Sequence, residues 1–196
     1  DRLGIAAEKK IVLYAPTYRP DRRHRASRRA GLDRYRSEVE LDLDAVRGLL
    51  GDDHVLLVRP HPKTVDAVPE ADGHTVVDVS RWPDVQELLL ASDVLVTDWS
   101  AIMVDFAVTG RPMVLWDDDP RRADGAEGHA ASIHPFLDVA AFPGPVVTES
   151  DQLVEAALSA LDSSRDDTAY RAFVETWCPG VDGKAAARAV DVLLEA

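Results

Sequence analysis

Six apolar runs of strand length recur along the chain, and segments with helical spacing separate most of them. The runs are rich in Val, Ile and Leu and are continuous rather than alternating, which is typical of strands covered on both faces. Such an order predicts right-handed crossovers and a doubly wound α/β domain with a parallel sheet. We expect strands at 11–15, 54–59, 74–79, 93–98, 111–116 and 144–149, and helices at 41–50, 84–92, 100–109, 150–162, 167–177 and 184–195.

Charge and cysteine content exclude several classes of protein. The net charge of −13 argues against a nucleic-acid binder, which would be basic overall. The single cysteine, Cys178, excludes a disulfide framework and a cysteine zinc site, and it fits a reducing compartment. No uncharged apolar stretch approaches the ~20 residues that cross a bilayer, and the first ten residues lack the apolar core of a signal peptide.

The stretch "VRPHPKT", residues 58–64, ends one of the apolar runs. Pro60 and Pro62 fix their own φ and hold His61 between them in an extended conformation. An imidazole held rigidly at a strand end beside Arg59 predicts a functional site. The alternative is that His61 has only a structural role.

The stretch "ASDVLVTDWSAIMVDF", residues 91–106, predicts a strand that ends at Thr97 and Asp98. A helix that begins near Trp99 and Ser100 would present free amides and its positive dipole end at the carboxyl edge of the sheet, where phosphate binds. The alternative is that Asp98 or Ser100 only caps the helix.

Common nucleotide and metal signatures do not occur. No glycine-rich dinucleotide fingerprint follows the first strand, and no glycine-rich loop ends in Gly-Lys-Ser/Thr, which argues against an NAD dehydrogenase and a P-loop ATPase. His61 has no closely spaced His or Asp partners, so no metal site is indicated.

Five stretches in order carry a more specific signal: "KKIVLYAPTYR", "LVRPHP", "DVSRWPDVQELLLASDVLVTDWSAIMVDFAVTGRPMVLW", "PGPVVTESDQL" and "DGKAAARAVDVLL". This series resembles the CDP-glycerol glycerophosphotransferase family of teichoic acid and capsule synthesis, in its C-terminal, nucleotide-binding half. The resemblance implies a GT-B architecture of two Rossmann-like halves. We therefore expect residues 1–196 to form one CDP-donor-binding domain, and the acceptor-binding half to precede Asp1 in a longer protein.

Site residues carry over from the resemblance one at a time. His61 matches the histidine beside the donor diphosphate, with Arg59 next to it, and Thr97, Asp98 and Ser100 match the phosphate-binding turn. Two departures are Trp99, where tyrosine is usual, and Ala101, where a second serine is usual. The missing hydroxyl removes one phosphate hydrogen bond, worth about 0.5–3 kcal/mol.

Two further groups are candidates with structural alternatives. Trp82 would pack on the pyrimidine while Asp84 or Glu87 meets the ribose; otherwise Trp82 anchors a loop and Asp84 caps a helix. Lys184 and Arg188, four residues apart, would face the cleft; otherwise they are solvated surface charges.

The expected reaction moves glycerol phosphate, or another polyol phosphate, from a CDP-linked donor to a hydroxyl of a growing polymer and releases CMP. His61 would act as the base or as a charged stabiliser. No cofactor beyond the donor is implied. The alternatives are a GT-B glycosyltransferase that uses a nucleotide sugar, and a non-catalytic nucleotide-binding or interaction domain.

Arginines define the expected second partner. Between Arg19 and Arg36 the chain has eight arginines and two acids. This segment predicts contact with an anionic, lipid-linked acceptor, or with the anionic inner face of the cell membrane, where a cytoplasmic enzyme would work. A solvated loop is the alternative. The arginines proposed for this contact are Arg22, Arg23, Arg25, Arg28 and Arg29.

Overall fold

The computed structural model describes residues 2–17, 41–61, 68, 71–117, 138–163 and 167–195. Six strands form one sheet in the order β3-β2-β1-β4-β5-β6, and every neighbouring pair is parallel. The predicted parallel α/β fold is confirmed. The strands are β1 (Lys10–Tyr14), β2 (His54–Val58), β3 (Val76–Asp78), β4 (Val94–Thr97), β5 (Met113–Trp116) and β6 (Val146–Val147).

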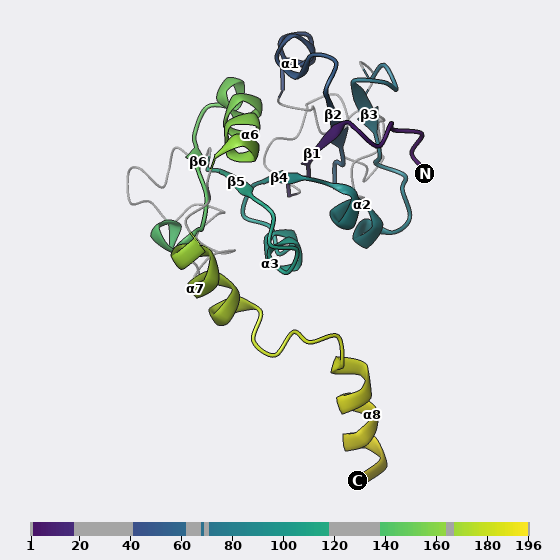
Figure 1. Cartoon of the computed structure of the whole chain (residues 1–196), viewed down its shortest axis with the longest axis vertical. Coiled ribbons are helices and arrows are strands. Elements are labelled where there is room, and N and C mark those ends of the chain that lie inside the picture. The colour runs from purple at the N-terminus through teal and green to yellow at the C-terminus, as the bar shows by residue number, and fades with distance from the viewer. Residues whose placement is uncertain are drawn as a thin grey trace, which may run out of the picture.

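Helices cover both faces of the sheet (Figure 1). On one face lie α1 and α6, and on the other lie α2, α3 and α7. The α-helices are α1 (Leu43–Leu50), α2 (Val85–Ala91), α3 (Ile102–Ala107), α6 (Leu153–Asp162), α7 (Asp167–Trp177) and α8 (Ala185–Glu195), and two 3-10 turns are η2 (Val139–Ala141) and η3 (Ser150–Gln152).

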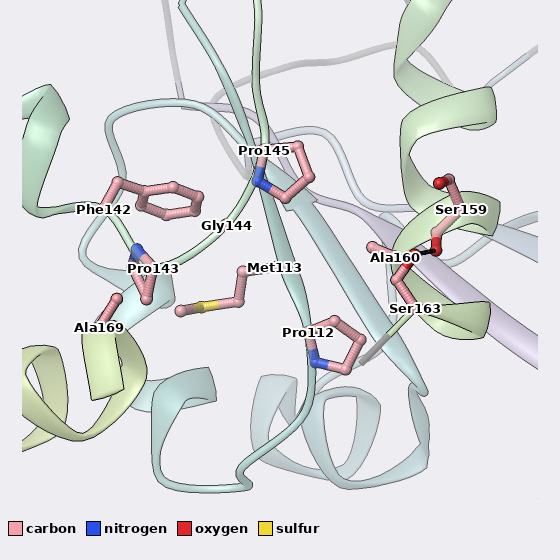
Figure 2. Close-up of a pocket in the computed structure, with 10 residues that line it drawn as sticks. All are labelled: Pro112, Met113, Phe142, Pro143, Gly144, Pro145, Ser159, Ala160, Ser163 and Ala169. Carbon is pink, nitrogen blue, oxygen red and sulfur yellow. Dashed lines mark hydrogen bonds between the residues drawn. The ribbon is translucent and has the colours of Figure 1, made fainter. Parts of the chain in front are cut away.

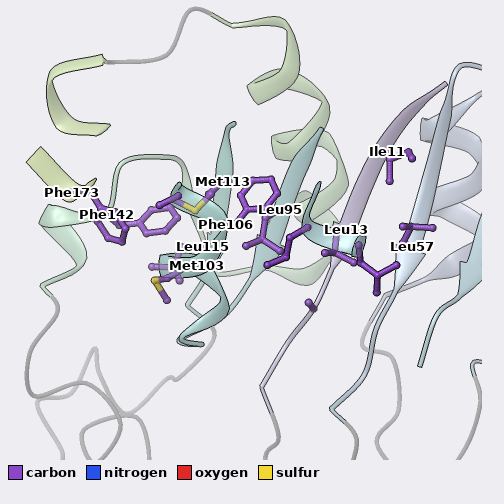
Figure 3. Packing of buried hydrophobic residues seen from close by; sticks show 14 of the residues in the cluster. Ile11, Leu13, Leu57, Leu95, Met103, Phe106, Met113, Leu115, Phe142 and Phe173 are labelled. Carbon is purple, nitrogen blue, oxygen red and sulfur yellow. The ribbon is translucent and has the colours of Figure 1, made fainter. Parts of the chain in front are cut away.

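Side chains of each central strand alternate between the two faces. In β1, Leu13 packs with the α2 and α3 side, whereas Val12 and Tyr14 pack with the α1 and α6 side. Figure 3 shows the first of these layers, where Phe106 of α3 and Phe142 lie over the strands. Both faces need apolar residues, which explains why the strand sequences are continuous runs.

Two edge strands are shorter than the sequence predicts. β3 covers 76–78 and not 74–79, and β6 covers 146–147 and not 144–149. Each lies at an edge of the sheet and pairs on one side only, so fewer of its residues enter the ladder. The first turn of the predicted helix at 150–162 is η3, and α6 begins at Leu153.

The strand order places a topological switch point between β1 and β4. The crossover that follows β1 contains α1, and the crossover that follows β4 contains α3 on the opposite face. Open α/β sheets with this order bind ligands in the crevice outside the carboxyl ends of the strands at the switch point. For this sheet, the rule predicts a ligand next to the residues that follow Tyr14 and Thr97.

Candidate functional site

The residues that end β4 face β1. Thr97 and Asp98 are both completely buried. The Thr97 hydroxyl donates to the Ala15 carbonyl at 2.7 Å. The two Asp98 carboxylate oxygens accept from the amide and from the hydroxyl of Thr17, each at 2.7 Å. These two side chains therefore join the strands on either side of the switch point.

The next turn contains Ser100. Its amide donates to the Asp98 carbonyl at 2.6 Å, and its half-buried hydroxyl accepts from the Ile102 amide at 3.4 Å, a long contact. The prediction that the helix begins near Trp99 and Ser100 is wrong by two residues: α3 begins at Ile102, and its N-cap is Ala101, which makes no side-chain capping bond. The capping alternative thus fails in its usual form, because neither Asp98 nor Ser100 occupies the N-cap position.

Trp99 is part of the core. It is 5% exposed, and its indole N–H donates to the Asp117 carboxylate at 2.9 Å, just beyond the end of β5. The bond ties the turn after β4 to the end of the neighbouring strand. The departure from tyrosine at this position therefore has a structural role.

Arg59 and His61 follow β2 at the same edge of the sheet, and both are half-buried. The Arg59 guanidinium donates to the carbonyls of Val79 and Trp82, at 3.1 and 2.9 Å. Burial lowers the pKa of Arg59, and the charge of Asp84 partly offsets this effect. Arg59 thus fixes the loop between β3 and α2, while phosphate binding by Arg59 and His61 stays a prediction.

The predicted nucleoside group forms a cluster of its own. Glu87 accepts from the Trp82 indole N–H at 2.9 Å and pairs with Arg2, whose guanidinium lies 5.0 Å from the centre of the Trp82 ring. Asp84 is the N-cap of α2 and accepts from the Gln86 amide at 2.9 Å. The contacts of Trp82 and Asp84 therefore match the structural alternatives, and nucleoside binding stays a prediction.

Lys184 and Arg188 are exposed and lie away from the sheet. Figure 1 shows α8 standing apart from the layered part of the molecule. The Arg188 guanidinium donates to both carboxylate oxygens of Asp182, at 2.7 and 2.8 Å, and the Lys184 amide donates to the same carboxylate at 2.9 Å. Their predicted place in a cleft is untested. The five candidate arginines between Arg22 and Arg29 lie outside the described residues.

An apolar pocket of about 360 Å³ lies at the opposite edge of the sheet (Figure 2). Pro112 and Met113 line it at the start of β5, and Phe142 and Gly144 line it from the segment before β6. None of the candidate site residues lines this pocket. It is therefore separate from the ligand edge that the fold defines.

Sequence reasoning missed Thr17, Asp117 and Arg2. Asp117 follows β5 directly and Thr17 lies three residues after the end of β1, so the rule that ligands gather at strand ends was a usable signal for both. Nothing in the sequence pairs Arg2 with Glu87. In the part of the chain that the structure describes, no three His, Cys, Asp or Glu residues are grouped to hold a metal ion, and no helix has the length and apolarity to cross a membrane.

The strand order defines an α/β domain of the doubly wound class, in which ligands bind at the ends of the strands on either side of the switch point. The family model of the CDP-glycerol:poly(glycerophosphate) glycerophosphotransferases matches residues 1–195. The chain belongs to this family, as the resemblance implied.

Individual relatives agree with this family assignment. The teichoic acid glycerol-phosphate transferase of Staphylococcus aureus is 35% identical over 95% of this chain and 46% of its own length. The wall teichoic acid polymerase TagF superposes with a TM-score of 0.72 and 27% identity, over 99% of this chain and 45% of that one. A TagF variant soaked with CDPG superposes with a TM-score of 0.70 and 27% identity, over 99% of this chain and 43% of that one. The chain thus spans about half the length of these relatives.

Proposed function

We propose that this chain is the donor-binding half of a transferase that moves glycerol phosphate, or another polyol phosphate, from a CDP-linked donor to a growing wall polymer. The observation that carries the proposal is the family match over residues 1–195. The fold supports it, because the residues of the family's motifs at 59–61 and 97–100 follow β2 and β4 at one edge of the sheet.

In this reaction an acceptor hydroxyl attacks the β-phosphorus of the donor in line. The bond from that phosphorus to the bridging oxygen breaks, and CMP leaves with the electron pair. Catalysis then consists of positioning and charge stabilisation. A phosphate beside His61 favours the protonated imidazole, so we assign this residue to charge stabilisation and the base to the acceptor-binding half.

The acceptor in this proposal is an anionic, lipid-linked polymer at the inner face of the membrane. Arg22, Arg23, Arg25, Arg28 and Arg29 supply the local positive charge in a chain that is otherwise acidic. Guanidinium groups bind phosphates in a bidentate manner, and such surface contacts weaken as salt screens them.

Calorimetry with CDP tests donor binding by the chain. We expect heat of binding with CDP and none with ATP. Ser100→Ala should raise the Kd for CDP about 10- to 150-fold, the effect of losing one hydrogen bond to a charged group. The matched variant Ala101→Ser should change the Kd less. Equal, negligible heats for all nucleotides would remove the donor-site proposal, and an unchanged Kd for Ser100→Ala with lowered thermal stability would make that hydroxyl a helix contact only.

A further inference from the structure

Three consecutive residues at the end of β4 bind the segment that continues β1. The Val96 carbonyl accepts from the Ala15 amide at 2.9 Å, and the Thr97 hydroxyl donates to the Ala15 carbonyl at 2.7 Å. Asp98 then binds Thr17 twice. The strand ladder itself ends at Tyr14 and Val96, so Thr97 and Asp98 extend the connection between the strands by side-chain bonds into the switch-point crevice.

The chemistry of Asp98 explains which way it faces. An ionised carboxylate only accepts hydrogen bonds, and its charge repels a phosphate. In this structure both of its oxygens accept from Thr17 at 2.7 Å, and the residue is completely buried. Short bonds to a charged acceptor are among the stronger hydrogen bonds in proteins. Asp98 is therefore directed toward β1.

The backbone of the same residue orients the turn that follows. The Asp98 carbonyl accepts from the Ser100 amide at 2.6 Å, so the side chain and the main chain of one residue join Thr17 to Ser100. A backbone shift that breaks the contact with Thr17 would also move the Asp98 peptide group that binds Ser100. The contact with Thr17 and the position of the turn are therefore coupled through Asp98.

We propose that Asp98 and Thr17 form a clamp across the switch point and that both are positioning residues for donor binding. In this assignment Ser100 meets the donor phosphate, and Asp98 acts through Thr17 rather than by touching the phosphate. The proposal rests on the proposed function, because it assumes a phosphate at this edge. It adds Thr17 to the donor site and changes the role that the family motif suggests for Asp98.

The test compares Thr17→Val, which keeps the shape and removes the hydroxyl, with Thr17→Ser, which keeps the hydroxyl. The matched control is Thr176→Val in α7, because the Thr176 hydroxyl also makes one bond, to the Ala172 carbonyl at 2.8 Å, but within a single helix. Hydrogen exchange in the ligand-free chain is measured at the amides of residues 99–103, and the Kd for CDP is measured by calorimetry.

We expect Thr17→Val to accelerate exchange at residues 99–103 and to raise the Kd for CDP about tenfold, and Thr17→Ser and Thr176→Val to stay within about twofold of wild type. Asp98→Asn should weaken CDP binding in the same way. The double variant Thr17→Val with Asp98→Asn should be no weaker than the worse single variant, because both remove the same contact.

Several results would overturn the clamp. Unchanged exchange at residues 99–103 in both Thr17→Val and Asp98→Asn would show that the contact does not hold the turn. Normal CDP affinity in both variants, together with reduced thermal stability, would reduce the contact to a structural one while the proposed function stands. A wild-type chain that binds no CDP would remove the proposed function itself, and the positioning role with it.

Discussion

Replacing His61 with alanine is expected to lower kcat at least about 100-fold in the full-length protein, the usual effect of removing an acid-base or charge-stabilising group. Folding should survive, because His61 is half-buried and lies beyond the end of β2. Steady-state transfer from CDP-glycerol measures the effect, and the thermal midpoint of unfolding checks the fold.

His54 provides the matched control, because it lies at the amino end of the same strand, at the opposite edge of the sheet. Its ring contacts the Leu50 carbonyl at 3.0 Å. His54→Ala should leave kcat within about twofold of wild type. If His61→Ala also retained activity within a few-fold, His61 would be structural and the catalytic assignment would fail.

Gly144→Ala is expected to destabilise the domain by about 1–3 kcal/mol, the usual cost of forcing extra volume into a packed site. A Cβ atom at this position would lie 2.1 Å from the Met113 carbonyl oxygen. That neighbour is backbone within β5, so relief requires a shift of the strand or of the segment that leads to β6. Figure 2 shows Gly144 beside Met113. Urea unfolding measures the change in the free energy of unfolding.

Gly48→Ala is the control for Gly144→Ala. Gly48 lies in α1, and a Cβ atom there would have nothing within 4 Å. Alanine in a helix interior is favoured over glycine by roughly 0.5–1 kcal/mol, so this variant should be more stable than wild type. A Gly144→Ala variant as stable as wild type would show that the segment before β6 moves freely away from Met113.

The fold could be predicted from local patterns because buried strands and amphipathic helices each have a characteristic spacing of apolar residues in the sequence. Strands buried on both faces must be continuously apolar, and β1, β2, β4 and β5 lie within two residues of their predicted positions at either end. The edge strands β3 and β6 were predicted too long, because apolar runs show burial and not which residues find a ladder partner.

For the candidate site, the sequence predicted which strand ends contribute residues, but not how those residues contact one another. The rule that ligands gather at the carboxyl edge selected the regions of His61 and Ser100. The contacts of the candidate residues join positions distant in sequence, such as Thr17 with Asp98, 81 positions apart, and Arg2 with Glu87, 85 positions apart. Pairs of residues so distant in sequence leave no periodic pattern. The orientation of Asp98 toward β1 could therefore be seen only in the structure.

The most direct test of the donor assignment is a transfer assay on the purified full-length protein. Labelled CDP-glycerol, CDP-ribitol and a UDP-sugar are offered separately with a lipid-linked acceptor. We expect labelled glycerol phosphate in the polymer with one CMP released per unit added, and no transfer from the UDP-sugar. Transfer from the UDP-sugar with none from either CDP-linked donor would contradict the assignment and make the protein a glycosyltransferase.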